Sequence, residues 1–173
     1  LKRMNRGTTG AVIKARIAQL REMIPGVTVR TTFLVGYPGE TEADFELLLD
    51  YIKEARFERV GAFAYSREEG TPSHDLDQQL PKDVRQRRLD ALMYAQRDIS
   101  RAHNEAMVGQ TVEVLVEGPS DESPLVWCGR TAAQAPEIDG RTYLSGFEDL
   151  RKGEMVAGVV TQATDYDLVV EPA

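Results

Sequence analysis

The sequence predicts an α/β unit over residues 1–106, followed by a small all-β domain over residues 107–173. Two observations lead to this fold class. In the first unit, apolar residues at helical spacing alternate with short β-branched runs, which is typical of parallel strands joined by helices. In the second, the apolar period changes to two, and about five short strands lie between turns rich in Gly, Pro and Asp. This pattern favours a small closed or sandwich-like β-module, similar in size to oligonucleotide-binding barrels.

The α/β unit is predicted to contain two strands, each preceded by a helix, and one long final helix. Both faces of the first strand, residues 27–35, are largely uncharged, which indicates that both are covered. Thr41 and Asp44 have the spacing of a capping box and open the helix after it. The expected elements are a helix from Thr8 or Thr9 to Pro25, the strand 27–35, a helix from Thr41, a strand at 59–65, a surface loop at 66–81 and a helix at 82–106.

The all-β domain carries the negative charge of the chain. Its strands are expected at residues 112–117, 125–128, 142–144, 155–161 and 168–170. Residues 107–173 contain 12 acidic and four basic side chains, a net charge of −8, whereas residues 1–106 have a net charge of +1. A strongly negative surface repels nucleic acid and attracts basic protein. The charge therefore disfavours a tRNA partner and favours a basic protein partner.

The composition is that of a core-forming chain with no membrane segment. Of the 173 residues, 42% are hydrophobic and 28% are charged, and no apolar run approaches the roughly 20 residues that a membrane span needs. The single cysteine, Cys128, excludes an internal disulfide framework and a self-contained cysteine metal site, and it fits a cytoplasmic protein. Because the chain starts at Leu1 without an initiator Met, we expect it to be the C-terminal part of a longer protein.

The turn after the first strand, Gly36-Tyr37-Pro38-Gly39-Glu40, is the main candidate for a ligand site. Ligands of alternating β/α proteins bind at such strand ends, and glycines let the backbone approach a ligand closely. The acidic residues Glu40, Glu42 and Asp44 at the following helix start disfavour a phosphate, and the Lys-Ser/Thr pair of a phosphate loop is missing. The alternative is an ordinary tight turn between strand and helix.

Two further pairs of residues are candidates, one on the first strand and one at the end of the second. Arg30 and Thr32 share one strand face and could bind a carboxylate; the alternative for Arg30 is a structural salt bridge. Tyr65-Ser66, at the end of the second strand, could present backbone polar groups to an adenine-like ring, and the alternative is a plain surface strand end.

Several separated motifs resemble one enzyme family. Residues 1–7, 30–41 and 63–72 resemble the radical S-adenosylmethionine methylthiotransferases, and the segment from Val108 resembles the β-barrel module called TRAM that ends those proteins. Residues 135–140, followed by Tyr143-Leu144, resemble the RimO-like branch. Enzymes of that branch methylthiolate an aspartate on the twelfth protein of the small ribosomal subunit.

The resemblance implies an open, partial β/α barrel that uses S-adenosylmethionine and 4Fe-4S clusters, one of them held by a three-cysteine motif. It implies that the turn from Gly36 to Glu40 shapes the adenosyl pocket and that Tyr65 and Ser66 approach the adenine. Arg30 and Thr32 become candidates for the polar ends of S-adenosylmethionine or for the target carboxylate. In the branch-specific loop, the candidates for substrate binding are Glu137 and Asp139.

The departures from the family pattern limit what this chain can do alone. The cluster cysteines are missing, and Cys128 lies in the wrong domain, so we expect no catalytic residue and no metal ligand here. Gln134 stands where the branch has an aspartate, and Val169-Val170 where it has a glycine. Two alternatives stay open, a tRNA adenosine methylthiotransferase and a non-catalytic binding module. The sulfur and electron donors are not identified by the sequence.

Overall fold

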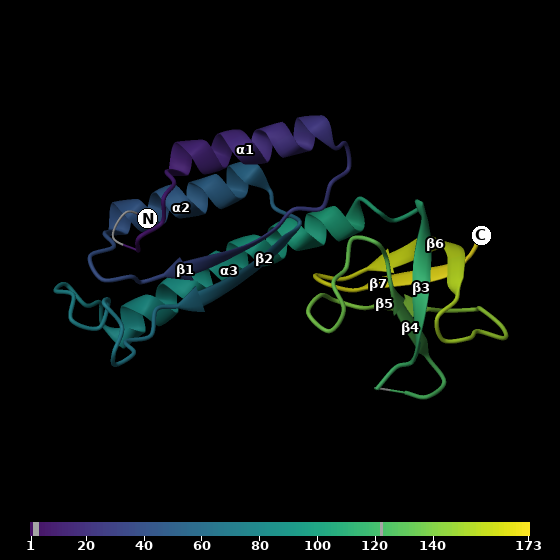
Figure 1. Ribbon diagram of the computed structural model, residues 1–173. Helices are drawn as coiled ribbons and strands as arrows, with labels where there is room; N and C mark the ends of the chain where they lie inside the picture. The colour runs from purple at the N-terminus through teal and green to yellow at the C-terminus, as the bar shows by residue number, and fades with distance from the viewer. Residues whose placement is uncertain (2–3, 122) are drawn as a thin grey trace.

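The computed structural model describes residues 1, 4–121 and 123–173, so that Lys2, Arg3 and Glu122 lie outside the described residues. An α/β part and a β-barrel follow one another along the chain (Figure 1). This is the fold class that the sequence predicts. The elements are α1 (Gly10–Met23), β1 (Arg30–Val35), α2 (Glu42–Ala55), β2 (Arg59–Ala64), α3 (Lys82–Glu105), β3 (Thr111–Pro119), β4 (Trp127–Arg130), β5 (Thr142–Leu144), β6 (Met155–Ala163) and β7 (Leu168–Pro172).

The helix starts follow the local capping chemistry of the sequence. The hydroxyl of Thr9 accepts a hydrogen bond from the Val12 amide at 3.3 Å and caps α1. At α2, the side chain of Thr41 and the carboxylate of Asp44 cap each other's backbone amides, which confirms the predicted capping box. The Thr41 hydroxyl also donates to the Asp44 carboxylate, at 2.6 Å. The hydrogen bonds from this hydroxyl and from the Thr41 amide lower the pKa of the Asp44 carboxyl below its ordinary value, and burial opposes the shift.

Strands β1 and β2 form a parallel pair whose register sets the geometry of the site. Arg30 lies opposite Arg59, and Val35 opposite Ala64, so that the two strands begin and end together. The strand predicted at 27–35 therefore starts three residues late, because β2 offers no partner before Arg59. The Val29 amide donates instead to the Glu58 carboxylate, at 2.8 Å.

The helices cover one face of this two-stranded sheet. Val35 belongs to a core formed with α2 and α3, whose buried members are Val35, Phe45, Ile52, Leu92 and Ile99. On the other face, Leu34 is 36% exposed and Phe63 is 64% exposed within the described part of the chain. The prediction that both faces are covered is thus wrong for this chain, since neutral side chains line a strand face whether or not another layer covers it.

The C-terminal part is a closed five-stranded barrel with the strand order β3-β4-β5-β7-β6. Its core is built by residues that alternate along the strands, as the period of two predicts; the buried members are Val114, Val116, Leu144, Val160, Leu168 and Val170. The predicted strand at 125–128 lies two residues further on, at Trp127–Arg130.

The last turns of α3 hold the barrel through its β6–β7 turn. Ser100 donates to the Asp165 carbonyl at 2.7 Å, and Arg101 donates to the Asp165 carboxylate at 2.6 Å. Asn104 donates to the Thr164 carbonyl at 3.1 Å. Among the described residues, no helix is long and apolar enough to cross a membrane.

Candidate functional site

The turn after β1 and the end of β2 lie at one edge of the sheet. The Tyr65 amide donates to the Val35 carbonyl at 2.8 Å and continues the ladder past the last paired residues. The rings of Tyr37 and Tyr65 meet edge to face, with 5.4 Å between their centroids. Gly36 and Gly39 have φ values of 75° and 81°, which other residues rarely adopt, so the turn depends on glycine. The structure therefore brings the predicted turn and Tyr65-Ser66 together.

An apolar pair lies beside this edge, on the open face of the sheet. Leu34 and Phe63 are directly opposite each other in the parallel register and are both exposed. An exposed apolar pair next to a glycine-containing turn is a suitable support for a flat ring such as adenine. Sequence reasoning did not select these two residues, although their alternation with the buried Val35 puts Leu34 on the face away from the helices.

Glu40 points back into the turn and does not face solvent. Its Oε1 accepts from the Gly36 amide at 2.9 Å and from the Arg88 guanidinium at 2.6 Å, and its side chain is 14% exposed. Arg88 also donates to the Glu42 carboxylate at 2.8 Å. Burial would lower the pKa of Arg88, but the hydrogen bonds to Glu42 and Glu40 raise it. Glu40 therefore shapes the turn in this structure and is not free to bind a ligand.

Arg88 is a site residue that the sequence interpretation missed. It lies near the start of the helix expected at 82–106, and the sequence analysis selects no candidate residue from that helix. Its position four residues before Leu92 and eight before Gln96, both buried, is the signal that places it on the inner stripe of α3.

The polar groups of Tyr65 are largely engaged within the protein. Its carbonyl accepts a hydrogen bond from the Arg85 guanidinium, and its hydroxyl donates to the Ser73 carbonyl at 2.9 Å. The Ser66 hydroxyl donates to the Glu68 carboxylate at 2.6 Å. Of this pair, the exposed Ser66 is thus better placed than Tyr65 to offer main-chain groups to a ligand.

Arg30 lies at the opposite end of β1 from the turn, about 16 Å away at the usual strand rise. Its guanidinium forms an ion pair with Asp139 of the barrel. The Nε atom of Arg59, the register partner of Arg30, lies 3.8 Å from the same carboxylate. Burial lowers the pKa of Arg59, and Asp139 opposes the shift. The structural alternative for Arg30 is therefore observed, although its ion pair joins two domains and does not lie within the sheet.

Asp139 is held inside its own loop as well. Its carboxylate accepts from the Ala135 amide at 2.6 Å, and its side chain is 7% exposed. Gln134, which departs from the family pattern, is buried and ties the loop together through the Thr131 amide at 2.8 Å and the Gly140 carbonyl at 2.7 Å. Glu137 is exposed at the tip of the loop. Of the two predicted substrate contacts, Glu137 alone is accessible.

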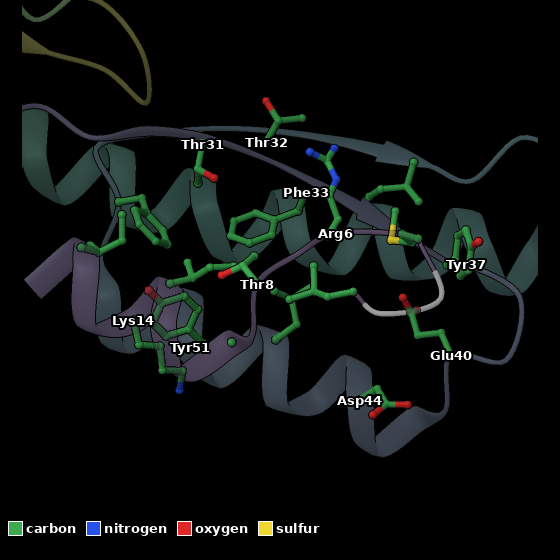
Figure 2. Close-up of a pocket in the computed structure, with 18 of the residues that line it drawn as sticks. Arg6, Thr8, Lys14, Thr31, Thr32, Phe33, Tyr37, Glu40, Asp44 and Tyr51 are labelled. Atoms are coloured by element: carbon green, nitrogen blue, oxygen red, sulfur yellow. The ribbon is translucent and has the colours of Figure 1, made fainter.

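A cavity of about 740 Å³ lies on the helix side of β1 (Figure 2). Its walls come from α1, α2, β1 and the N-terminal segment, and Tyr37, Glu40 and Asp44 lie at one end. Thr31 and Phe33 point toward the helices, whereas Thr32 points away, to the open face. The cavity lies along the edge of β1 that is not paired with β2, and its size is in the range of ligand pockets.

The chain offers no iron–sulfur ligand set in its described part. No group of three His, Cys, Asp or Glu side chains there could hold a metal ion. Cys128 is buried in the barrel, and burial raises the pKa of its thiol. The described residues therefore do not fit a 4Fe-4S cluster.

Comparisons with known proteins give one consistent result. The family model described as TRAM domain matches residues 108–172. The chain itself is 51% identical to "Ribosomal protein uS12 methylthiotransferase RimO" of Sorangium cellulosum (strain So ce56). This match extends over 171 residues, which are 99% of the chain and 35% of that protein. A protein of the same name from Anaeromyxobacter sp. (strain K) is 49% identical over 98% of the chain, which covers 36% of it. The chain thus spans about a third of the length of the curated relatives it matches.

Proposed function

We propose that this chain, which belongs to the family of the RimO methylthiotransferases, is the C-terminal part of a longer enzyme. In this proposal, the enzyme methylthiolates the β-carbon of an aspartate on the twelfth protein of the small ribosomal subunit. The observation that carries the proposal is the 44–51% identity to proteins of that name along nearly the whole chain. The relatives are about three times as long, so the activity is proposed for the full-length protein and not for this part alone.

In this proposal, the common end of β1 and β2 holds the adenosyl part of S-adenosylmethionine. The Gly36–Gly39 turn allows close approach of the backbone, and Leu34 and Phe63 offer apolar surface beside it. S-adenosylmethionine supplies the adenosyl and methyl groups for this chemistry. The parts of this chain then bind and orient the cofactor, while the ligands of the 4Fe-4S clusters are proposed to lie elsewhere in the full-length protein.

The charge of the barrel supports a protein substrate over a tRNA. The barrel segment has a net charge of −8, which would repel phosphates and attract a basic ribosomal protein. The exposed Glu137 belongs to this acidic surface and is the accessible candidate for contact with the substrate.

The test uses the full-length protein with reconstituted clusters, S-adenosylmethionine, a reductant and a sulfide source. One sample receives the purified twelfth protein of the small subunit, and a parallel sample receives unmodified tRNA. Mass spectrometry should find the methylthio increment on one aspartate of the ribosomal protein and none on the tRNA. Modification of the tRNA with an unmodified ribosomal protein would instead support the sibling activity.

A further inference from the structure

The first turns of α3 contact both strand ends of the candidate site. Arg88, which is 4% exposed, donates to the Glu40 carbonyl at 3.1 Å as well as to the carboxylates of Glu40 and Glu42. One turn earlier, Arg85 donates to the Tyr65 carbonyl and lies over the Tyr65 ring, 5.9 Å from its centroid. The two arginines thus join the β1 turn and the β2 end to the same helix.

The contact with the turn is tight. The Gly36 amide donates to Glu40, and the position where Gly36 would carry a Cβ is occupied by the Arg85 side chain. The carboxylate of Glu40 therefore has one hydrogen bond within the turn and one to α3. Since a buried charge without its partner is costly, this pair strongly favours a single arrangement of the turn.

We propose that Arg88 and Arg85 are positioning residues, which set the separation and orientation of the Gly36–Glu40 turn and Tyr65 so that the edge is preformed for an adenosyl ligand. The proposal rests on the proposed function, because the ligand class comes from it. A preformed site loses less conformational freedom when the ligand binds, so these arginines raise affinity without touching the ligand.

A purely structural role for Arg88 makes a different prediction, and a pair of variants separates the two. Arg88→Met leaves the Glu40 carboxylate buried without its cation and should destabilise the protein. In the double variant Glu40→Met/Arg88→Met, both charges are replaced by apolar groups of similar length, a change that restores stability in other proteins. The double variant still lacks the hydrogen bond from Gly36 and the link to α3.

The experiment measures two quantities in the full-length protein. Calorimetry gives the affinity for S-adenosylhomocysteine, an unreactive probe with the same adenosyl group, and urea titration gives the unfolding midpoint. The double variant should recover the midpoint and still bind the probe roughly tenfold or more weakly, because misplaced contacts lower binding steeply. Arg87→Met, which removes an exposed arginine next to Arg88, should change neither quantity.

Amide hydrogen exchange provides a readout that needs no ligand. In the double variant the Gly36 amide should exchange at least tenfold faster although the unfolding midpoint is normal. Unchanged exchange at Gly36, or a recovered midpoint with wild-type affinity, would overturn the positioning role. If the unaltered protein does not bind the probe while Gly36 exchange still responds, the proposed ligand fails and the role of Arg88 in shaping the turn remains.

Discussion

Arg30 and Asp139 form an ion pair between the α/β part and the barrel, 109 positions apart in the sequence. Arg59 approaches the same carboxylate, so two strand-initial arginines converge on one acid of the barrel. The Arg59 and Asp139 side chains are 12% and 7% exposed, and this burial strengthens their interaction relative to a surface pair. The contacts of Asp139 with the two arginines and the contacts of α3 with Asp165 together fix the barrel against the ends of β1 and β2 where the strands begin.

Asp139→Asn should weaken the coupling between the two parts. The change keeps the shape of the side chain but leaves Arg59 and Arg30 facing a neutral group, at a cost of about 1–3 kcal/mol in the free energy of unfolding. Trp127, the single tryptophan, reports on the barrel by fluorescence, and the helical circular dichroism reports on the α/β part. We expect the two urea transitions to coincide in the unaltered chain and to separate in the variant.

Glu113→Gln is the matched control for this prediction, since it removes an exposed acid from the same barrel. It should leave both transitions in place. The deficit of Asp139→Asn should also shrink in about 1 M salt, where the Debye length falls to ~3 Å and the partly exposed Arg30 is screened. Coincident, unshifted transitions in Asp139→Asn would show that the ion pair does not couple the parts.

Gly36→Ala should destabilise the chain and disturb the turn. The backbone φ of 75° is unfavourable for alanine, and the new methyl group would overlap the Arg85 side chain. The expected loss is about 1–3 kcal/mol, measured by urea unfolding. Gly61→Ala is the control, because its methyl group would meet only the Thr32 hydroxyl at an ordinary 3.6 Å. Equal stability of the two variants would contradict the assigned role of Gly36.

The capping box at α2 should make part of the stability depend on acid pH. The pKa of Asp44 is lowered in the folded state by its hydrogen bonds with Thr41, so the ionised carboxylate stabilises the fold. This contribution is complete above the unfolded pKa of about 3.9 and is lost as the pH falls through the lower folded value. Because Asp44 is exposed and water screens its charge, Asp44→Asn should cost only about 0.3–1 kcal/mol at pH 7 and converge with the unaltered chain near pH 2.

Asp50→Asn, an exposed change later in the same helix, is the control for the pH experiment. It should show no comparable deficit at pH 7, since Asp50 does not cap the helix start. A deficit of Asp44→Asn that stays constant from pH 7 to pH 2 would assign the effect to the side chain's shape and not to its charge.

The order of the elements could be predicted from the sequence because each boundary has a local cause. Thr41 caps the helix that it is predicted to start, and Thr9, one of the two candidates Thr8 and Thr9, caps the first helix. The change to a period of two after Gly109 marks the barrel. The coverage of β1 could not be predicted in the same way. Both faces carry largely uncharged side chains, so the sequence does not tell which face the helices cover. That is decided by the tertiary structure.

The geometry of the candidate site was predictable where it depends on the turn itself and not where it depends on distant partners. The glycines and Tyr65 meet at one edge because parallel strands end together. Arg88 and Asp139 acquire their partners 48 and 109 positions away, a separation that leaves no local pattern. Glu40 and Arg30, both predicted as ligand contacts, are engaged by these distant partners in the structure.

The most direct test of the account is hydrogen exchange of the full-length protein with and without saturating S-adenosylhomocysteine. We predict that the probe slows exchange in the peptides that contain Gly36–Glu40 and Tyr65-Ser66 and leaves the barrel strands unchanged. Protection that is absent from both strand ends, with bound probe confirmed by calorimetry, would contradict the proposal that this edge holds the adenosyl group.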